Sequence, residues 1–315
     1  MHNKSASGYG GLENTPLARI GYHSKIIANG YEKDFLPLIV NDSITDEVAM
    51  CNQVVQFQKQ PRVGPWRRYE KNQEMVPDQI APDGFCMRLC ESAYKNIKFD
   101  KMDIAFACNR WGAFEEGFLD DSWQELAGEW RGYALNGIVL EASGRNKGAA
   151  AGRNCDINLG TINAPRLITG LSFGREVAKI KRALEEAHRW VDGQMYLVLP
   201  PAIKELLVES PYANALQMGS CVDCSVLVTG QLPGQILGFD VFYTNDVPAV
   251  IDAATGNLAY YIVAGRKDAF AFVGDVIEGR LVEPHRYFGV EYQMLAVWGS
   301  KAIMPDALAV AYWTV

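Results

Sequence analysis

The chain has 315 residues, of which 49% are hydrophobic and 21% charged, and its formal net charge is −7. This composition fits neither a disordered chain nor a membrane protein, and no stretch approaches the roughly 18 uninterrupted apolar residues of a spanning helix. The acidic balance also argues against a dedicated nucleic-acid binder, whose affinity comes from cationic side chains that neutralise phosphates.

Residues 1–30 are rich in Gly, Ser and Asn and show no periodic apolar pattern, which predicts an arm without a core of its own. The same residues lack the apolar core of a signal peptide, so we expect a cytosolic product from which no leading segment has been removed. An arm of this kind frays unless something holds it. The simplest support is a neighbouring subunit.

Residues 51–77 alternate short, polar, strand-like stretches around a turn signal at Pro61, Gly64 and Pro65. The pattern predicts a long, two-stranded ribbon with little core to pack on. Because an isolated ribbon is marginal in water, we expect another chain to support it.

The segment from Phe85 to Phe99 alternates like a strand that is buried on one side. Its two faces carry, respectively, Phe85, Met87 and Leu89, and Cys86, Arg88 and Cys90. A strand is therefore predicted directly after the ribbon.

Apolar residues at nearly helical spacing predict one helix of about 40 Å over residues 114–141. The predicted apolar stripe is Phe114, Phe118, Trp123, Leu126, Trp130, Tyr133 and Ile138. Four glycines lie within this span, each costing about 1 kcal/mol relative to alanine: Gly117, Gly128, Gly132 and Gly137. The glycines predict a helix that is bent or bends easily, and a glycine-rich loop is predicted over residues 144–158.

The segment from Ser172 to Trp190 predicts an amphipathic helix that Ser172 caps. A buried strand is predicted over residues 194–199, and Pro200 and Pro201 then begin a short helix. Most of the remaining chain is predicted to form strands, because it consists of short apolar stretches. The predicted strands are 225–230, 235–245, 258–265, 268–274, 292–304 and 307–315. Strands, then helices, then strands indicate an α+β fold rather than a doubly wound parallel sheet.

Motifs for chemistry are sparse. An odd number of cysteines, seven, without a signal peptide indicates buried free thiols rather than a disulfide framework. Cys221 and Cys224 form a CxxC that lacks two further zinc ligands and leads into a strand, which favours structural thiols. Ser143–Gly148 has the wrong order for a phosphate loop and indicates a flexible loop. No catalytic residue, cofactor site or metal site is predicted.

Several segments resemble, in order, the major capsid proteins of tailed bacteriophages. Gly234–Pro248, GQILGFDVFYTNDVP, resembles a G-x-I-x-G-F-x-V pattern of that family. Gly193–Leu207 resembles the strand and helix that precede it, and Trp298–Val310 resembles the closing strands. Upstream, Gln53–Lys71 resembles the extended hairpin and Phe114–Glu141 the long spine helix.

The resemblance implies the capsid-protein fold, of α+β class, with five parts. These are an N-terminal arm (1–50), an extended hairpin called the E-loop (51–80), a peripheral domain with the spine helix (81–160), an axial domain (161–275), and closing strands that return to the peripheral and axial sheet (276–315). The glycines depart from the alanine-rich spine of the family.

The resemblance also implies a virion protein, assembled in the host cytoplasm, that forms hexamers and pentamers of an icosahedral head around double-stranded DNA. Its expected partners are itself, a scaffolding protein, a portal protein and a decoration protein, without sequence-specific DNA contacts or a membrane. Arginine and aromatic residues are enriched at interface hot spots. The candidate self-assembly contacts are accordingly four ribbon residues: Trp66, Arg67, Arg68 and Tyr69.

Two other functions remain open at this point. An encapsulin-like nanocompartment would have the same fold with a protein cargo. A metal- or thiol-dependent enzyme would be built around Cys221 and Cys224.

Overall fold

The computed structural model describes residues 34–41, 54–59, 66–75, 77, 83–107, 111–209, 235–253 and 255–315. Most of the predicted arm, the turn signal at residues 61–65 and the Cys221–Cys224 motif lie outside these ranges. Among the helices that are described, none has the length and apolar character needed to cross a membrane. The described side chains include no group of three or more His, Cys, Asp or Glu that could hold a metal ion.

Strand-rich and helical regions follow one another broadly as the sequence predicts, although α1 and α3 were not predicted. The strand predicted at 225–230 lies outside the described residues. The helices are α1 (Leu36–Ile39), α3 (Lys101–Ala107), α4 (Trp111–Glu141), α5 (Phe173–Glu186) and α6 (Ala202–Glu209), with short 3-10 turns at Gly144–Asn146 and Pro305–Ala307. The strands are β1 (Val54–Lys59), β2 (Asp83–Arg88), β3 (Glu91–Asp100), β4 (Arg166–Leu167), β5 (Met195–Leu199), β6 (Gln235–Ile236), β7 (Phe239–Tyr243), β8 (Ala249–Ile251), β9 (Leu258–Arg266), β10 (Phe270–Val282), β11 (Gly289–Ala302) and β12 (Leu308–Thr314).

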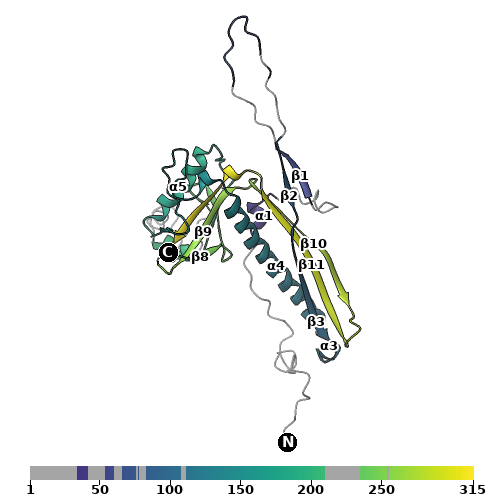
Figure 1. The fold of residues 1–315 in the computed structure, drawn as a ribbon. Coiled ribbons are helices and arrows are strands. Elements are labelled where there is room, and N and C mark those ends of the chain that lie inside the picture. The colour runs from purple at the N-terminus through teal and green to yellow at the C-terminus, as the bar shows by residue number, and fades with distance from the viewer. Residues whose placement is uncertain are drawn as a thin grey trace, which may run out of the picture.

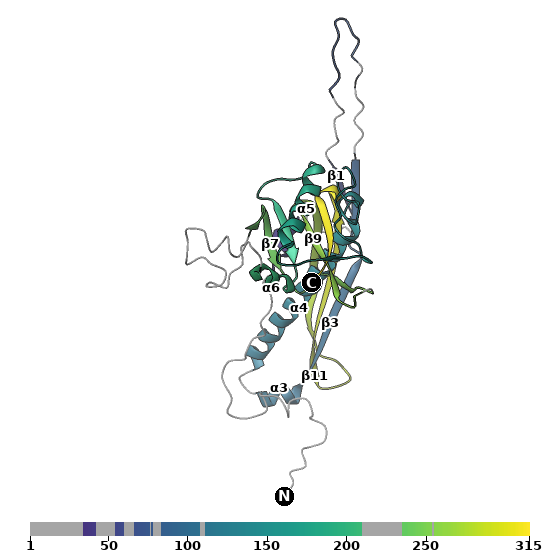
Figure 2. The ribbon, with the colours of Figure 1, turned by 90° about the vertical axis from the view of Figure 1, so that its left-hand side faces the viewer.

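Seven of the described strands form one mixed sheet in the order β4-β12-β9-β5-β7-β6, with β8 on β9. Helices cover both faces of this sheet (Figures 1 and 2). On one face α5 and α6 bury side chains such as Phe173, Ile180 and Ile203 against the strands. On the other face α1 and the end of α4 form a second core, which includes Ile39 and Leu135.

A second, antiparallel sheet of three described strands, β10-β11-β3, extends away from the first, and α4 lies along it (Figure 1). The strand β10 joins the two regions: its first residues, such as Phe270, are buried in the core, whereas Ile277 and Leu281 further along are exposed. A bulge between Val276 and Glu278 inserts one extra residue into β10, a feature that bends a strand and increases its twist.

The predicted helix over residues 114–141 is confirmed as α4, which begins at Trp111 and runs unbroken to Glu141. Its apolar stripe is confirmed only in the later turns, where the Trp130 ring centroid lies 5.9 Å from that of Phe272 and 6.4 Å from that of Trp298. Trp123, in the earlier part, is 45% exposed. Burial is concentrated where α4 meets both sheets.

Gly137 lies where α4 packs closely against β10 and β11. A Cβ atom added there would be 2.8 Å from the tip of the Phe270 ring and 3.1 Å from Ser300 Oγ. At Gly117 and Gly132 an added Cβ would meet nothing within 4 Å. Gly137 therefore permits the packing of α4 onto β10 and β11, and the glycines do not interrupt the helix.

Arg131 joins three segments that are distant in sequence. Its side chain is only 6% exposed; Nε donates a hydrogen bond of 2.7 Å to Asp246 Oδ2, and Nη1 lies 3.8 Å from Asp34 Oδ1. The ion pairs connect α4 to the residues before α1 and to those after β7. A charge removed from water in this way needs its partners.

The predicted helix beginning at Ser172 is confirmed as α5, but Ser172 makes no side-chain cap bond. Its Oγ instead accepts a hydrogen bond of 2.9 Å from Thr169 N in the preceding turn. The helix ends at Glu186, before the predicted Trp190, because His188 takes the left-handed φ of 54°. The backbone bond from Arg189 N to Leu184 O completes a Schellman C-cap.

Ser143–Gly148, interpreted from the sequence as a flexible loop, is packed against the end of the chain. Asn146 is 1% exposed, and its Nδ2 donates to Asp306 O at 2.7 Å and to Leu308 O at 3.0 Å. The loop has a structural role because it satisfies backbone carbonyls at the start of β12.

The ribbon differs from its predicted form. Antiparallel pairing joins β1 to β2, so the second strand is Asp83–Arg88 and no strand follows residue 65 within 66–75. The single strand predicted over residues 85–99 is divided into β2 and β3, which pair with β1 and β11 respectively. At the division, the chain crosses β11 so closely that a Cβ on Gly299 would lie 2.3 Å from Arg88 O.

We predict that Gly137→Ala lowers the free energy of unfolding by about 1–3 kcal/mol, since the new methyl group overlaps the fully buried ring of Phe270. Gly132→Ala is the matched control and should raise stability by up to about 1 kcal/mol through helix propensity. Urea unfolding of the purified protein measures both. A Gly137→Ala protein as stable as Gly132→Ala would contradict this packing.

We also predict that Arg131→Met destabilises the protein by about 2 kcal/mol, less than the roughly 3–5 kcal/mol of a fully buried pair, because the Asp246 side chain is 29% exposed. Adding Asp246→Asn to this variant should recover part of the lost stability, since the double variant no longer contains the Asp246 carboxylate without its Arg131 partner. Denaturant unfolding of both variants tests this. No recovery in the double variant would show that the ion pair is not the cause.

Candidate assembly surfaces

The four candidate contacts lie in the segment 66–75, which extends away from the body beyond β1 and β2 (Figures 1 and 2). A turn closes this segment: Gln73 N donates to Glu70 O at 3.0 Å, and Glu70 N donates to Gln73 Oε1 at 3.2 Å. Asn72 takes a left-handed φ of 69° there, which asparagine tolerates better than most residues. The described turn thus follows the four candidates, whereas the sequence placed the turn before them.

All residues from 66 to 75 are exposed. Trp66 is fully exposed, Tyr69 is 71% exposed and Met75 is 83% exposed. Contiguous exposed apolar patches are typical of interaction sites, whereas single exposed apolar residues are common. Trp66, Arg67, Arg68 and Tyr69 are consecutive in the chain and all exposed on one projecting segment.

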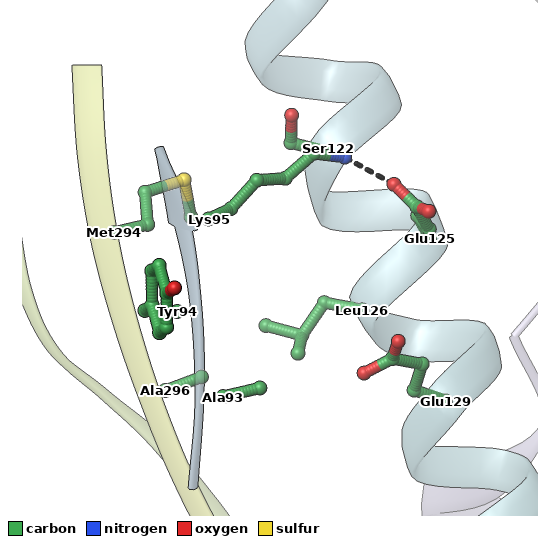
Figure 3. A pocket seen from close by; sticks show the side chains of 9 residues that line it. All are labelled: Ala93, Tyr94, Lys95, Ser122, Glu125, Leu126, Glu129, Met294 and Ala296. Carbon is green, nitrogen blue, oxygen red and sulfur yellow. Dashed lines mark hydrogen bonds and ion pairs between the residues drawn. The ribbon is translucent and has the colours of Figure 1, made fainter. Parts of the chain in front are cut away.

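A groove of about 210 Å³ lies between α4 and the three-stranded sheet (Figure 3). Leu126 points from α4 toward the strands, and the small side chains of Ala93 and Ala296 leave the space open. An ion pair from Lys95 to Glu125 closes one end, and Glu129 stands at the other. The groove thus combines an apolar floor with carboxylates at its rim.

The opposite face of the three-stranded sheet carries a connected polar network. Glu291 accepts hydrogen bonds from the Tyr287 hydroxyl and from Asn96 Nδ2, which hold the pKa of its carboxyl below the usual range. Desolvation and the same hydrogen bond raise the pKa of Tyr287 to about 12. Lys98 Nζ lies 3.3 Å from the Tyr287 ring centroid, a cation–π contact. Both shifts move the pKa values further from neutral pH, so the Glu291 carboxylate stays ionised and the Tyr287 hydroxyl stays protonated there.

The cysteines correct one interpretation. Cys86, Cys90 and Cys155 are exposed free thiols, not the buried thiols that the sequence suggested. Cys86 is next to the buried Met87 on β2 and therefore lies on the opposite face, as the alternation predicted. Cys90 lies beyond the end of β2, and its side chain is hydrogen-bonded to Tyr133 of α4.

The groove was not predicted from the sequence. Its walls combine β3 with β11 through pairs such as Ala93 and Ala296, which are about 200 residues apart in the chain. One signal was available: α4 contains seven acidic residues and a single basic one, Arg131. Such an imbalance indicates an exposed acidic face.

Comparison with solved structures gives matches over nearly the whole chain. The structure titled Mycobacterium phage Che8 has a TM-score of 0.63 at 15% identity and covers 92% of this chain and 95% of its own. The capsid of Ralstonia phage GP4 has a TM-score of 0.63 at 12% identity, with 99% and 97% covered. The capsid of the cyanophage P-SCSP1u has a TM-score of 0.60 at 14% identity, with 93% and 92% covered.

No protein-family model and no curated protein matches the sequence. At sequence identities of 12–15%, the structural likeness is evidence for the fold alone. It confirms the α+β fold predicted from the resemblance: the chain has the fold of phage capsid proteins.

Proposed function

We propose that the protein is a major capsid protein that assembles into hexamers and pentamers of an icosahedral head around double-stranded DNA. The observation that carries this proposal is the likeness to phage capsid structures over more than nine-tenths of both chains. The projecting ribbon supports it, since a two-stranded ribbon without a core is stable only when something covers it.

The proposed division keeps an arm (1–50), an E-loop (51–80), a peripheral domain (81–160), an axial domain (161–275) and closing strands (276–315). The pairing of β1 with β2 extends the proposed E-loop to Arg88. In this scheme α4 is the spine helix and the seven-stranded sheet forms most of the axial domain.

The proposed location is the virion, after assembly in the host cytoplasm, with scaffolding, portal and decoration proteins as partners. The net charge of −7 suits a container, because a shell that does not neutralise phosphates does not adhere strongly to packaged DNA. We propose no catalytic role.

The proposed contact of the four ribbon residues is with a neighbouring copy. Their segment points away from its own α4 and β3 (Figure 1). The groove of another copy offers chemistry that fits them: Glu129 at the rim suits Arg68, and the apolar floor suits an aromatic ring. An engineered cavity of about 150 Å³ accepts benzene, so a groove of about 210 Å³ accepts one ring.

Arg68→Glu should raise the protein concentration needed for assembly by about fivefold, the equivalent of roughly 1 kcal/mol per contact. Glu129→Arg in the same chain should restore assembly by exchanging the two charges. Arg153→Glu, a like change on an exposed loop, is the control. Light scattering as a function of protein concentration measures the assembly of all three variants. If Arg68→Glu assembles at the same concentration as the wild-type protein, the proposed contact is contradicted.

Negative-stain microscopy of the expressed chain, with and without a co-expressed scaffolding protein, tests the function itself. Closed icosahedral particles are expected. Small oligomers of uniform size under every condition would contradict the proposal, and particles filled with a protein cargo would favour a nanocompartment.

A further inference from the structure

One end of the seven-stranded sheet is only four described strands wide and has two open edges. There Leu167 of β4 pairs with Thr314 of β12, Thr314 pairs with Ala259 of β9, and Ala259 pairs with Val250 of β8. Within the described residues, β4 has no other strand neighbour than β12, and β8 none other than β9. The two open edges thus belong to the same row of residues.

The backbone of β8 turns hydrogen-bonding groups toward its open edge. Asp252 N donates to Asn257 O at 2.9 Å, and Tyr261 N donates to Pro248 O at 2.9 Å. Because hydrogen-bonded positions alternate along an antiparallel pair, Val250 faces β9. The N–H and C=O groups of Ala249 and Ile251 consequently point away from the sheet.

The backbone of β4 does the same on the opposite side. Ile168 N donates to Thr314 O at 2.9 Å, and in a parallel pair this bond leaves the residue before it, Leu167, with its N–H and C=O directed outward. Edge strands are usually protected by charges, proline or a cover. Here the exposed side chains at the two edges include three apolar ones: Leu167 is 65% exposed, Ile251 is 67% exposed and Val250 is 44% exposed. The charge of Arg166, the other residue of β4, is paired with Glu176 of α5 at 3.3 Å.

We infer that β8 of one copy pairs with β4 of the next, so that the sheet continues from subunit to subunit. This inference rests on the proposed shell function and names a second interface for it. The strand directions allow it: β4 is parallel to β12, and both β12 and β8 are antiparallel to β9, so β8 and β4 run the same way.

The hydrogen bonds of the joint follow from the outward groups. Leu167 N donates to Ala249 O of the second copy, and Ile251 N of that copy donates to Leu167 O, which is one complete parallel bridge with Val250 opposite Leu167. Because β8 of one copy meets β4 of the next, the two sides of the contact differ and the arrangement is head-to-tail. A rotation about an axis parallel to the strands keeps the strand direction and relates successive copies, so the contact closes into a ring. The exposed side chains of Leu167 and Val250 then cover each other.

Disulfide trapping tests the joint. In one chain positions 167 and 250 are three strand spacings apart, about 14 Å, which is too far for a disulfide. The double variant Leu167→Cys/Val250→Cys in assembled particles should therefore give covalent multimers, larger than dimers, on a non-reducing gel. Reducing agent should return them to monomers.

Each single variant controls for the native cysteines. Leu167→Cys/Ile251→Cys is the matched control. Ile251 follows Val250 in β8, so its side chain points to the opposite face of the sheet. This second pair should therefore form far fewer disulfides. Particles of the first double variant that stay monomeric on the gel would overturn the edge pairing and leave the shell function intact. A parent chain that forms no particles would overturn both proposals.

Discussion

The close packing of α4 on β10 and β11 is the constraint on which the rest of the structure depends. Gly137 lets the helix lie against Phe270 and Ser300, and Glu141 accepts a 2.7 Å hydrogen bond from Lys301 one turn later. Since β10 begins in the core of the seven-stranded sheet and continues into the three-stranded sheet, this one junction fixes the direction in which the second sheet extends. The ion pairs of Arg131 add the residues before α1 to the same junction.

Three segments that extend away from that junction have little support from their own chain. The early part of α4 exposes Trp123, the far part of β10 exposes Ile277 and Leu281, and the segment 66–75 is exposed throughout. Apolar exposure of this extent is unusual for a monomer and typical of a protein that other copies complete. The same logic extends to the apolar edges β4 and β8. A rigid junction with unsupported extensions is a suitable design for a subunit whose outer parts are buried only on assembly.

The sequence predicted the elements whose signal is local. The helical spacing over residues 114–141, the amphipathic pattern of α5, the buried run of β5 and the prolines before α6 are all confirmed within a few residues. Pairings between distant segments were not predictable, because periodicity shows which face is buried but not against what. For this reason the partner of β1, the groove between α4 and β3, and the need for glycine at position 137 came only from the structure. The exposure of Trp66 and Tyr69 agrees with their candidate role, and the contact itself remains a prediction.

Amide hydrogen exchange, compared between assembled particles and dissociated subunits, tests most directly the claim that other copies complete this subunit. The amides of the segment 66–75 and those of Leu167 and Ile251 should exchange much more slowly in particles, because neighbours cover them there. The amides from Ala134 to Ile138 should exchange slowly in both states, since their own core buries them. Equal exchange of the ribbon and the sheet edges in the two states would contradict the account.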